Sequence, residues 1–310
     1  MTTPIIKSNF TTENGIYIKR DDLLPFSFGG NKVRIAEEYF KDMQKNGCDC
    51  IIGYGNARSN LCRIIANMSR KYNVKTYIIS PCDDDGVRRE TTNSLIVKAC
   101  GVQLISCLKE NVAQTVEDTL RLCCDHGYKP YYINGNQYGE GNEVTPMLAY
   151  VKAYKEIQLQ KKEMGIDFDY IFCAVGTGMT YSGLLAGKEE CRGKENIVGI
   201  SIAREVSRET KIIQKFLKCY FGAEKNINFE LTDKYLMGGY GECSNQIVEC
   251  IKREFLIDGV PLDTTYTGKA FYGMNDYLSS NQIKDKKILF IHTGGTPLFF
   301  DKINMILGEN

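Results

Sequence analysis

Short apolar runs alternate with amphipathic helical segments through most of this 310-residue chain. A short apolar run bounded by turn residues is typical of a buried strand, and the segments between these runs repeat apolar residues at helical spacing. Strand–helix repetition with right-handed crossovers produces a parallel sheet that is covered by helices. The sequence therefore predicts an α/β protein built on open, twisted parallel sheets.

The alternation falls into two series, separated by a long helix that we expect over 147–164. The first series has expected strands at 50–54, 75–79, 102–106 and 131–133, with helices at 59–72, 87–99 and 112–125. The second has expected strands at 170–175, 197–203 and 287–292, with helices that begin at Thr180 and near 209. We predict two domains: a large one formed by residues 1–36 and 149–310, and a small inserted one formed by residues 37–148.

The charge balance bears on the class of partner. Lys and Arg number 39 and Asp and Glu number 38, which gives a formal charge of +1 and predicts neither a nucleic-acid nor a membrane-surface partner. The first residues lack the apolar core of a signal peptide, and no run approaches the ~18 residues of a membrane helix. We therefore expect a cytoplasmic protein.

Thirteen cysteines raise the question of disulfides or a metal site. No Cys-x-x-Cys occurs, and only His126 and His292 could add imidazole ligands. We expect reduced, mostly buried thiols and no metal.

Lys32 lies in the segment FGGNKVR at 28–34, directly after two glycines and a strand-like run at 16–22. Glycines let the backbone approach another group closely. A lysine amine becomes a useful nucleophile when an enclosed site holds it against an aldehyde as a Schiff base. Taken alone, the segment is better explained as a turn followed by a solvated helix.

Three further segments follow Lys32 in a fixed order: GNARSN at 55–60, GTGMT at 176–180 and TGGTP at 293–297. With Lys32, the ordered set resembles the pyridoxal-phosphate enzymes of the tryptophan synthase β type (fold type II), and within them the family of 1-aminocyclopropane-1-carboxylate deaminase and D-cysteine desulfhydrase. The resemblance extends from about Ile16 to Phe300. It implies pyridoxal 5'-phosphate bound to Lys32, a small amino-acid substrate and two interleaved α/β domains. We also expect a homodimer.

The second segment has the features of a phosphate-binding turn, since a strand end, a glycine turn and a helix start supply backbone donors and a positive helix end. The residues are Gly176, Thr177, Gly178, Met179 and Thr180. The threonine hydroxyls can add hydrogen bonds. Met179 occupies a position at which the family often has glycine. The backbone amides remain available, because only the side chain differs. The plain alternative is an ordinary strand-to-helix turn.

Ser59 and Asn60 lie at another strand-to-helix junction, where either residue could simply cap the helix. The resemblance implies that Asn60 lies beside the phenolic oxygen of the cofactor. It places Ser59 on the substrate side, where a hydroxyl can bind the carboxylate or move a proton. The family usually has Gln or His next, and this chain has Leu61.

Two tyrosines, Tyr240 and Tyr266, lie in segments that resemble the active-site tyrosine loops of the family. Tyr266 would pack on the cofactor ring, and either hydroxyl can act as acid or base if nearby charge lowers its pKa. Thr267 aligns with the partner of the pyridine nitrogen, a position at which the ring-opening deaminases carry Glu and the D-cysteine desulfhydrases carry Thr. Thr293 and Gly294 would line the cofactor ring. The alternative for their segment, 293–297, is a purely structural turn before a helix.

These residues predict a pyridoxal-phosphate lyase that performs α,β-elimination on a small amino acid, most like D-cysteine desulfhydrase. The catalytic set is Lys32, Ser59, Tyr240 and Tyr266. A neutral partner at the pyridine nitrogen suits loss of a good β leaving group better than ring opening. A cyclopropane-carboxylate deaminase, a divergent β-replacement enzyme or racemase, and a non-catalytic sensor or scaffold remain alternatives.

Overall fold

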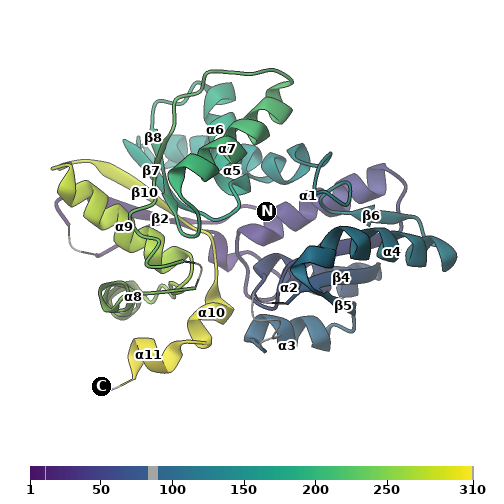
Figure 1. Ribbon diagram of the computed structural model, residues 1–310. Helices are drawn as coiled ribbons and strands as arrows, with labels where there is room; N and C mark the ends of the chain where they lie inside the picture. Colours follow the sequence, from purple (N-terminus) through teal and green to yellow (C-terminus); the bar gives the residue numbers. More distant parts are fainter. Residues whose placement is uncertain (11, 83–89, 240, 309–310) are drawn as a thin grey trace. The chain divides into compact units, whose positions relative to one another are not determined.

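The computed structural model describes residues 1–10, 12–82, 90–239 and 241–308 (Figure 1). The chain divides into two compact units. The large unit comprises Met1–Leu24, Phe28–Asn31 and Met147–Asn310, and the small unit comprises Pro25–Ser27 and Lys32–Pro146. The predicted domain boundaries, 36/37 and 148/149, lie a few residues after the positions 31/32 and 146/147 at which the chain passes from one unit to the other.

The large unit contains a six-stranded sheet of order β1-β2-β10-β7-β8-β9. All neighbours are parallel except β1 and β2, which are antiparallel. The strands are β1 (Ile5–Lys7), β2 (Gly15–Arg20), β7 (Tyr170–Val175), β8 (Asn196–Ser201), β9 (Glu230–Thr232) and β10 (Lys287–His292). The sequence did not predict β1 and β9, which are three-residue edge strands too short to show an apolar pattern.

Helices cover both faces of this sheet (Figure 1). Phe172 and Ala174 of β7 belong to one apolar cluster with Ile251 of α8 and Phe271 of α9, while α6 packs against β7 and β8. Burial on both faces explains why these strands are continuous apolar runs rather than alternating ones. Helix α5 (Val144–Met164) links the two units, and a 3-10 turn covers Asp21–Leu23. The other helices of the large unit are α6 (Met179–Cys191), α7 (Val206–Phe221), α8 (Asn245–Asp258), α9 (Thr267–Ser280), α10 (Thr296–Phe300) and α11 (Ile303–Leu307).

The small unit contains a four-stranded, fully parallel sheet of order β5-β4-β3-β6. The strands are β3 (Cys50–Tyr54), β4 (Lys75–Pro81), β5 (Gln103–Cys107) and β6 (Pro130–Tyr132), and the helices are α1 (Asn31–Lys45), α2 (Asn60–Tyr72), α3 (Thr92–Ala99) and α4 (Val112–Asp125), with a 3-10 turn at Lys109–Asn111. The predicted α/β class and its parallel sheets are confirmed.

The third helix begins later than the sequence indicated. Of the expected segment 87–99, residues 87–89 lie outside the described residues, and α3 begins at Thr92. Thr91 forms a capping box, in which its Oγ1 accepts from the Ser94 N–H group at 3.2 Å and Ser94 Oγ accepts from the Thr91 N–H group at 2.9 Å. Because Thr91 satisfies the free donors of the first turn, it fixes the start of the helix.

All thirteen cysteines are free thiols, but only Cys50, Cys62, Cys123 and Cys173 are buried, so the expectation of mostly buried thiols was wrong. The sulfur atoms of Cys50 and Cys123 lie 3.7 Å apart. Burial raises the pKa of both thiols, which keeps them protonated. Among the described helices, none combines the length and the apolar character needed to span a membrane.

Candidate active site

Lys32 follows a glycine turn that is tied to the end of β10. The Asn31 N–H group donates to the Thr293 carbonyl oxygen at 2.9 Å, and Gly30 has a φ of +102°. A Cβ atom at Gly30 would lie 2.9 Å from the Thr293 oxygen, and one at Gly294 would lie 2.5 Å from the Gly30 Cα. Both positions therefore require glycine, and the backbone just before Lys32 is fixed against residues 293–294.

Lys32 is the second residue of α1, and its side chain is half-buried. Burial lowers the pKa of its amino group from 10.5 to about 8. A lowered pKa leaves more of the amine unprotonated near neutral pH, and the neutral amine is the nucleophilic form. Lys32 therefore has the protonation behaviour that attack on an aldehyde requires.

The turn between β7 and α6 leaves the N–H groups of the helix start without a side-chain cap. Gly178 is the N-cap residue with a φ of +79°. The uncapped amides and the dipole of this 13-residue helix suit an anion such as a phosphate group. Asn31 Nδ2 donates to Thr180 Oγ1 at 2.9 Å, so the Thr180 hydroxyl keeps its own hydrogen for a ligand. Thr177 is exposed and Met179 is half-buried.

Arg204 supports the same turn, and the sequence analysis missed it. Its Nη1 donates to the Gly176 carbonyl oxygen at 2.6 Å and forms an ion pair with the Glu209 carboxylate at 3.1 Å. Glu209 is fully buried, and burial raises the pKa of its carboxyl group. No local motif pointed to Arg204, because its target is a backbone carbonyl on a different strand–helix connection.

Asp263 organises the turn that carries Tyr266 and Thr267. Its carboxylate accepts from the N–H groups of Thr265, Tyr266 and Thr267 at 2.8, 2.7 and 3.1 Å. Thr267 Oγ1 donates to Asp263 Oδ2 at 2.7 Å and accepts from the Asp263 N–H group at 2.8 Å. Asp263 is fully buried, and burial raises its pKa. The Thr267 hydroxyl therefore presents only a remaining lone pair to any ligand.

Tyr266 lies against the glycine turn of α6. A Cβ atom at Gly176 would lie 3.5 Å from Tyr266 Cε1, so the aromatic ring packs on the backbone of the turn. The predicted ring-stacking tyrosine and the predicted phosphate site are thus neighbours in the large unit. Tyr240 lies outside the described residues, and its role stays a prediction.

Lys269 holds the segment that leads to Tyr240. This buried lysine donates from Nζ to the carbonyl oxygens of Leu236 at 2.8 Å and Gly239 at 2.7 Å. Burial lowers the pKa of its amino group. Because its hydrogens are donated to backbone oxygens, Lys269 has a structural part here, unlike Lys32.

His292 is fully buried at the end of β10. Its Nδ1 accepts from the Gly294 N–H group at 3.1 Å, so the ring hydrogen is on Nε2, which lies 3.2 Å from the Pro261 carbonyl oxygen. Both ring nitrogens therefore take part in hydrogen bonds to the backbone, Nδ1 to the turn at 293–294 and Nε2 to Pro261.

Ser59 and Asn60 begin α2 in the small unit. Ser59 is the N-cap, and its Oγ accepts from the Cys62 N–H group at 3.2 Å. Asn60 is half-buried and its Oδ1 accepts from Asn93 Nδ2 at 3.0 Å. Leu61 is buried, so the position where the family usually has a polar side chain here contributes to the core. The capping interpretation of Ser59 therefore holds, and a chemical role would be additional.

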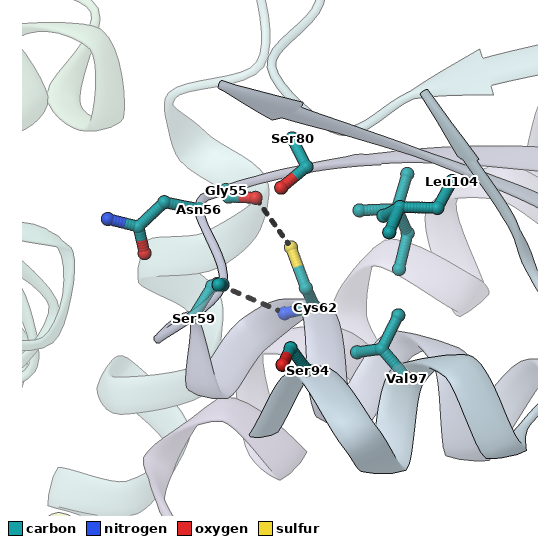
Figure 2. A pocket seen from close by; sticks show the side chains of 10 residues that line it. Gly55, Asn56, Ser59, Cys62, Ser80, Ser94, Val97 and Leu104 are labelled. Atoms are coloured by element: carbon teal, nitrogen blue, oxygen red, sulfur yellow. Dashed lines mark hydrogen bonds between the residues drawn. The ribbon is translucent and has the colours of Figure 1, made fainter. Parts of the chain in front are cut away.

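A small pocket lies at the turn between β3 and α2, and Figure 2 shows Ser59, Cys62, Ser80 and Ser94 among the side chains that line it. Cys62 Sγ lies 3.8 Å from the Gly55 carbonyl oxygen. Burial raises the pKa of the Cys62 thiol to about 12, so this sulfur is a poor nucleophile. The pocket therefore offers hydroxyl groups but no reactive thiol.

The large unit gathers the predicted site residues at the carboxyl ends of β7 and β10, which is where ligands bind in open parallel sheets. These residues come from the turns 29–31, 176–180 and 293–294 and from Tyr266. The small unit places Ser59 and Asn60 at the carboxyl end of β3. Two features suit a phosphorylated aldehyde cofactor: the uncapped start of α6 in the large unit and the lowered pKa of the Lys32 amino group.

A family model of pyridoxal-phosphate dependent enzymes matches residues 1–294. This chain belongs to that family. The predicted cofactor, pyridoxal phosphate, and the predicted catalytic class, a lyase or deaminase, are confirmed. A relative from Pyrococcus abyssi, named after 1-aminocyclopropane-1-carboxylate deaminase, is 30% identical over 297 residues, covering 92% of this chain and 86% of its own length.

Solved structures agree with this assignment. The crystal structure of a homologue of 1-aminocyclopropane-1-carboxylate deaminase is 29% identical, covers 99% of this chain and 93% of its own, and superposes with a TM-score of 0.83. A hydrogen sulfide-producing enzyme of Fusobacterium nucleatum is 20% identical, with 95% of each chain covered and a TM-score of 0.64, and shares the fold. The predicted fold of the tryptophan synthase β type is confirmed.

Proposed function

We propose that this pyridoxal-phosphate dependent enzyme removes a β-substituent from a small amino acid, as D-cysteine desulfhydrase does in forming pyruvate, ammonia and sulfide. The observation that carries this choice is Thr267. By the family resemblance, Thr267 is the residue that would face the pyridine nitrogen, and its hydroxyl donates to the Asp263 carboxylate at 2.7 Å. A hydroxyl in place of a carboxylate makes a weaker electron sink, which is sufficient when the leaving group is good.

The residues of the site have different proposed roles. When bound, pyridoxal phosphate withdraws electrons from the α-carbon of an amino acid joined to it. Lys32 would hold the cofactor through its amino group and, when free, would take the α-proton of the substrate. The start of α6 would bind the phosphate group through residues 176–180, with Thr180 adding its hydroxyl.

The remaining residues orient the ring and the substrate. Asn60 would donate to the phenolic oxygen, Tyr266 would pack on the ring, and Thr293 and Gly294 would line it. Ser59 would bind the substrate carboxylate or move a proton, and Tyr240 or Tyr266 would act as acid or base. We further propose that the enzyme is a cytoplasmic homodimer.

Ring opening of 1-aminocyclopropane-1-carboxylate is the second candidate, and a specific finding favours it. Both the Pyrococcus abyssi relative and the most similar solved structure described above carry the name of that deaminase. Buried Leu61 leaves β-replacement and racemisation as further possibilities, because a polar group usual in the family is missing at that position.

We expect D-cysteine or β-chloro-D-alanine to give pyruvate faster than 1-aminocyclopropane-1-carboxylate gives 2-oxobutyrate. Each substrate, together with L-cysteine and both forms of serine, is incubated with the yellow holoenzyme, and the two oxo acids are separated by chromatography. The absence of pyruvate from every β-substituted amino acid, together with formation of 2-oxobutyrate, would reverse the choice. Turnover without either oxo acid would indicate replacement or racemisation.

Ser59→Ala separates the capping role from the chemical one. Loss of the cap should cost about 0.5–2 kcal/mol in the free energy of unfolding. If Ser59 also handles a proton or the carboxylate, kcat/KM should fall by roughly 10²-fold or more while the yellow colour persists. Ser244→Ala, which removes the N-cap of α8, is the matched control and should cost stability alone. Normal turnover in the folded Ser59→Ala protein would move proton transfer to the tyrosines.

A further inference from the structure

Asn93 is fully buried near the start of α3 and contacts the turn that carries Asn60. Its Nδ2 donates to the Arg58 carbonyl oxygen at 2.9 Å and to Asn60 Oδ1 at 3.0 Å. Thr91, the capping residue of α3, donates from Oγ1 to the Ala57 carbonyl oxygen at 2.6 Å. Hydrogen bonds from the start of α3 therefore hold the turn at 57–60.

These contacts fix which way the Asn60 amide is turned. The Arg58 carbonyl oxygen can only accept, so the Asn93 atom that faces it is the nitrogen. The same nitrogen contacts the Asn60 amide, so the Asn60 atom there is the oxygen. Arg63 Nη2, which can only donate, lies 3.3 Å from that oxygen and requires the same orientation. Asn60 Nδ2 is therefore turned away from both donors.

We propose that Asn93 is a positioning residue that keeps the Nδ2–H group of Asn60 turned toward the phenolic oxygen of the cofactor. The inference rests on the proposed function, which places Asn60 beside that oxygen. A donor at this position stabilises the ionised oxygen and so lowers the pKa of the lysine-bound chromophore. If the amide were reversed, Asn60 Oδ1 would face the oxygen, and the ionised form would be disfavoured.

The test is the absorption spectrum of the holoenzyme, recorded against pH without substrate. Asn93→Asp replaces a donor by an acceptor and should reverse the Asn60 amide, raising the chromophore pKa by about one unit or more. Asn60→Ala removes the donor and should raise that pKa by a similar amount. Asn93→Leu, which leaves the Asn60 amide held by Arg63 alone, should produce a smaller shift in the same direction and serves if Asn93→Asp does not fold.

The added charge of Asn93→Asp is separated from the reorientation by a double-mutant comparison. In an Asn60→Ala background, Asn93→Asp should shift the chromophore pKa by less than half as much as in the wild type. Thr91→Val is the control: it removes a neighbouring bond to the same turn, and should lower thermal stability without moving the pKa. Equal shifts from Asn93→Asp in both backgrounds would overturn the positioning role. An unchanged chromophore pKa in Asn60→Ala would instead show that Asn60 does not contact the phenolic oxygen. In that case the placement of Asn60 in the proposed function would be wrong.

Discussion

Lys32→Ala should abolish the covalent attachment of the cofactor and lower turnover by about 10³–10⁶-fold, since the variant lacks both the attaching amine and the proposed base. The change shortens a half-buried side chain at the start of α1, so the fold should persist. The uncapped start of α6 should still retain some cofactor through its phosphate group. Borohydride reduction followed by peptide mass spectrometry locates the attachment in the wild type and tests its loss in the variant.

Lys45→Ala is the matched control, because Lys45 is the exposed last residue of the same helix. It should keep both the yellow colour and the activity of the wild type. A reduced cofactor found on a lysine other than Lys32 would contradict the assignment. Lys269, which is buried, is the most informative lysine to compare, since its Nζ is hydrogen-bonded to backbone carbonyl oxygens.

The sequence predicted three interior strands with their observed limits and the other interior strands, β2, β4 and β8, to within one or two residues, because their signal is local. The runs 50–54, 170–175 and 287–292 correspond to β3, β7 and β10. Each lies in the interior of a parallel sheet, where burial on both faces demands an unbroken apolar run. Edge strands β1 and β9 pair on one side only and are three residues long, so no unbroken apolar run marks them in the sequence.

The contrast between local and long-range signals also separates the site residues that the sequence predicted from those that it did not. Gly30, Gly178 and Gly294 were found because positive φ and close backbone approach require glycine, and that requirement is visible in the sequence. Asn93 and Arg204 were not found, because each acts on a turn far from it along the chain. Asp263 lies close to Thr267, yet its four hydrogen bonds to this turn depend on a side-chain conformation that no sequence pattern specifies.

Glu254→Gln should stabilise the protein above neutral pH by on the order of 2–4 kcal/mol. Glu254 is fully buried on α8, near the carboxylate of Asp258. Burial, reinforced by the charge of Asp258 and opposed by that of Arg20, raises its pKa from 4.5 to about 8. The folded state therefore binds this proton more tightly than the unfolded state.

The sign of the pH dependence follows from that difference. Stability from the protonated Glu254 is fully present below pH 4.5 and is lost as the pH rises to about 8, where the folded protein must ionise a buried group. Urea unfolding at pH values across this interval should show the wild type losing stability relative to Glu254→Gln, with the two profiles meeting at the acid end. Glu249→Gln removes the same charge from an exposed position on α8 and should run parallel to the wild type. Parallel profiles for Glu254→Gln as well would mean that Glu254 is ionised in the folded protein and is stabilised by its surroundings.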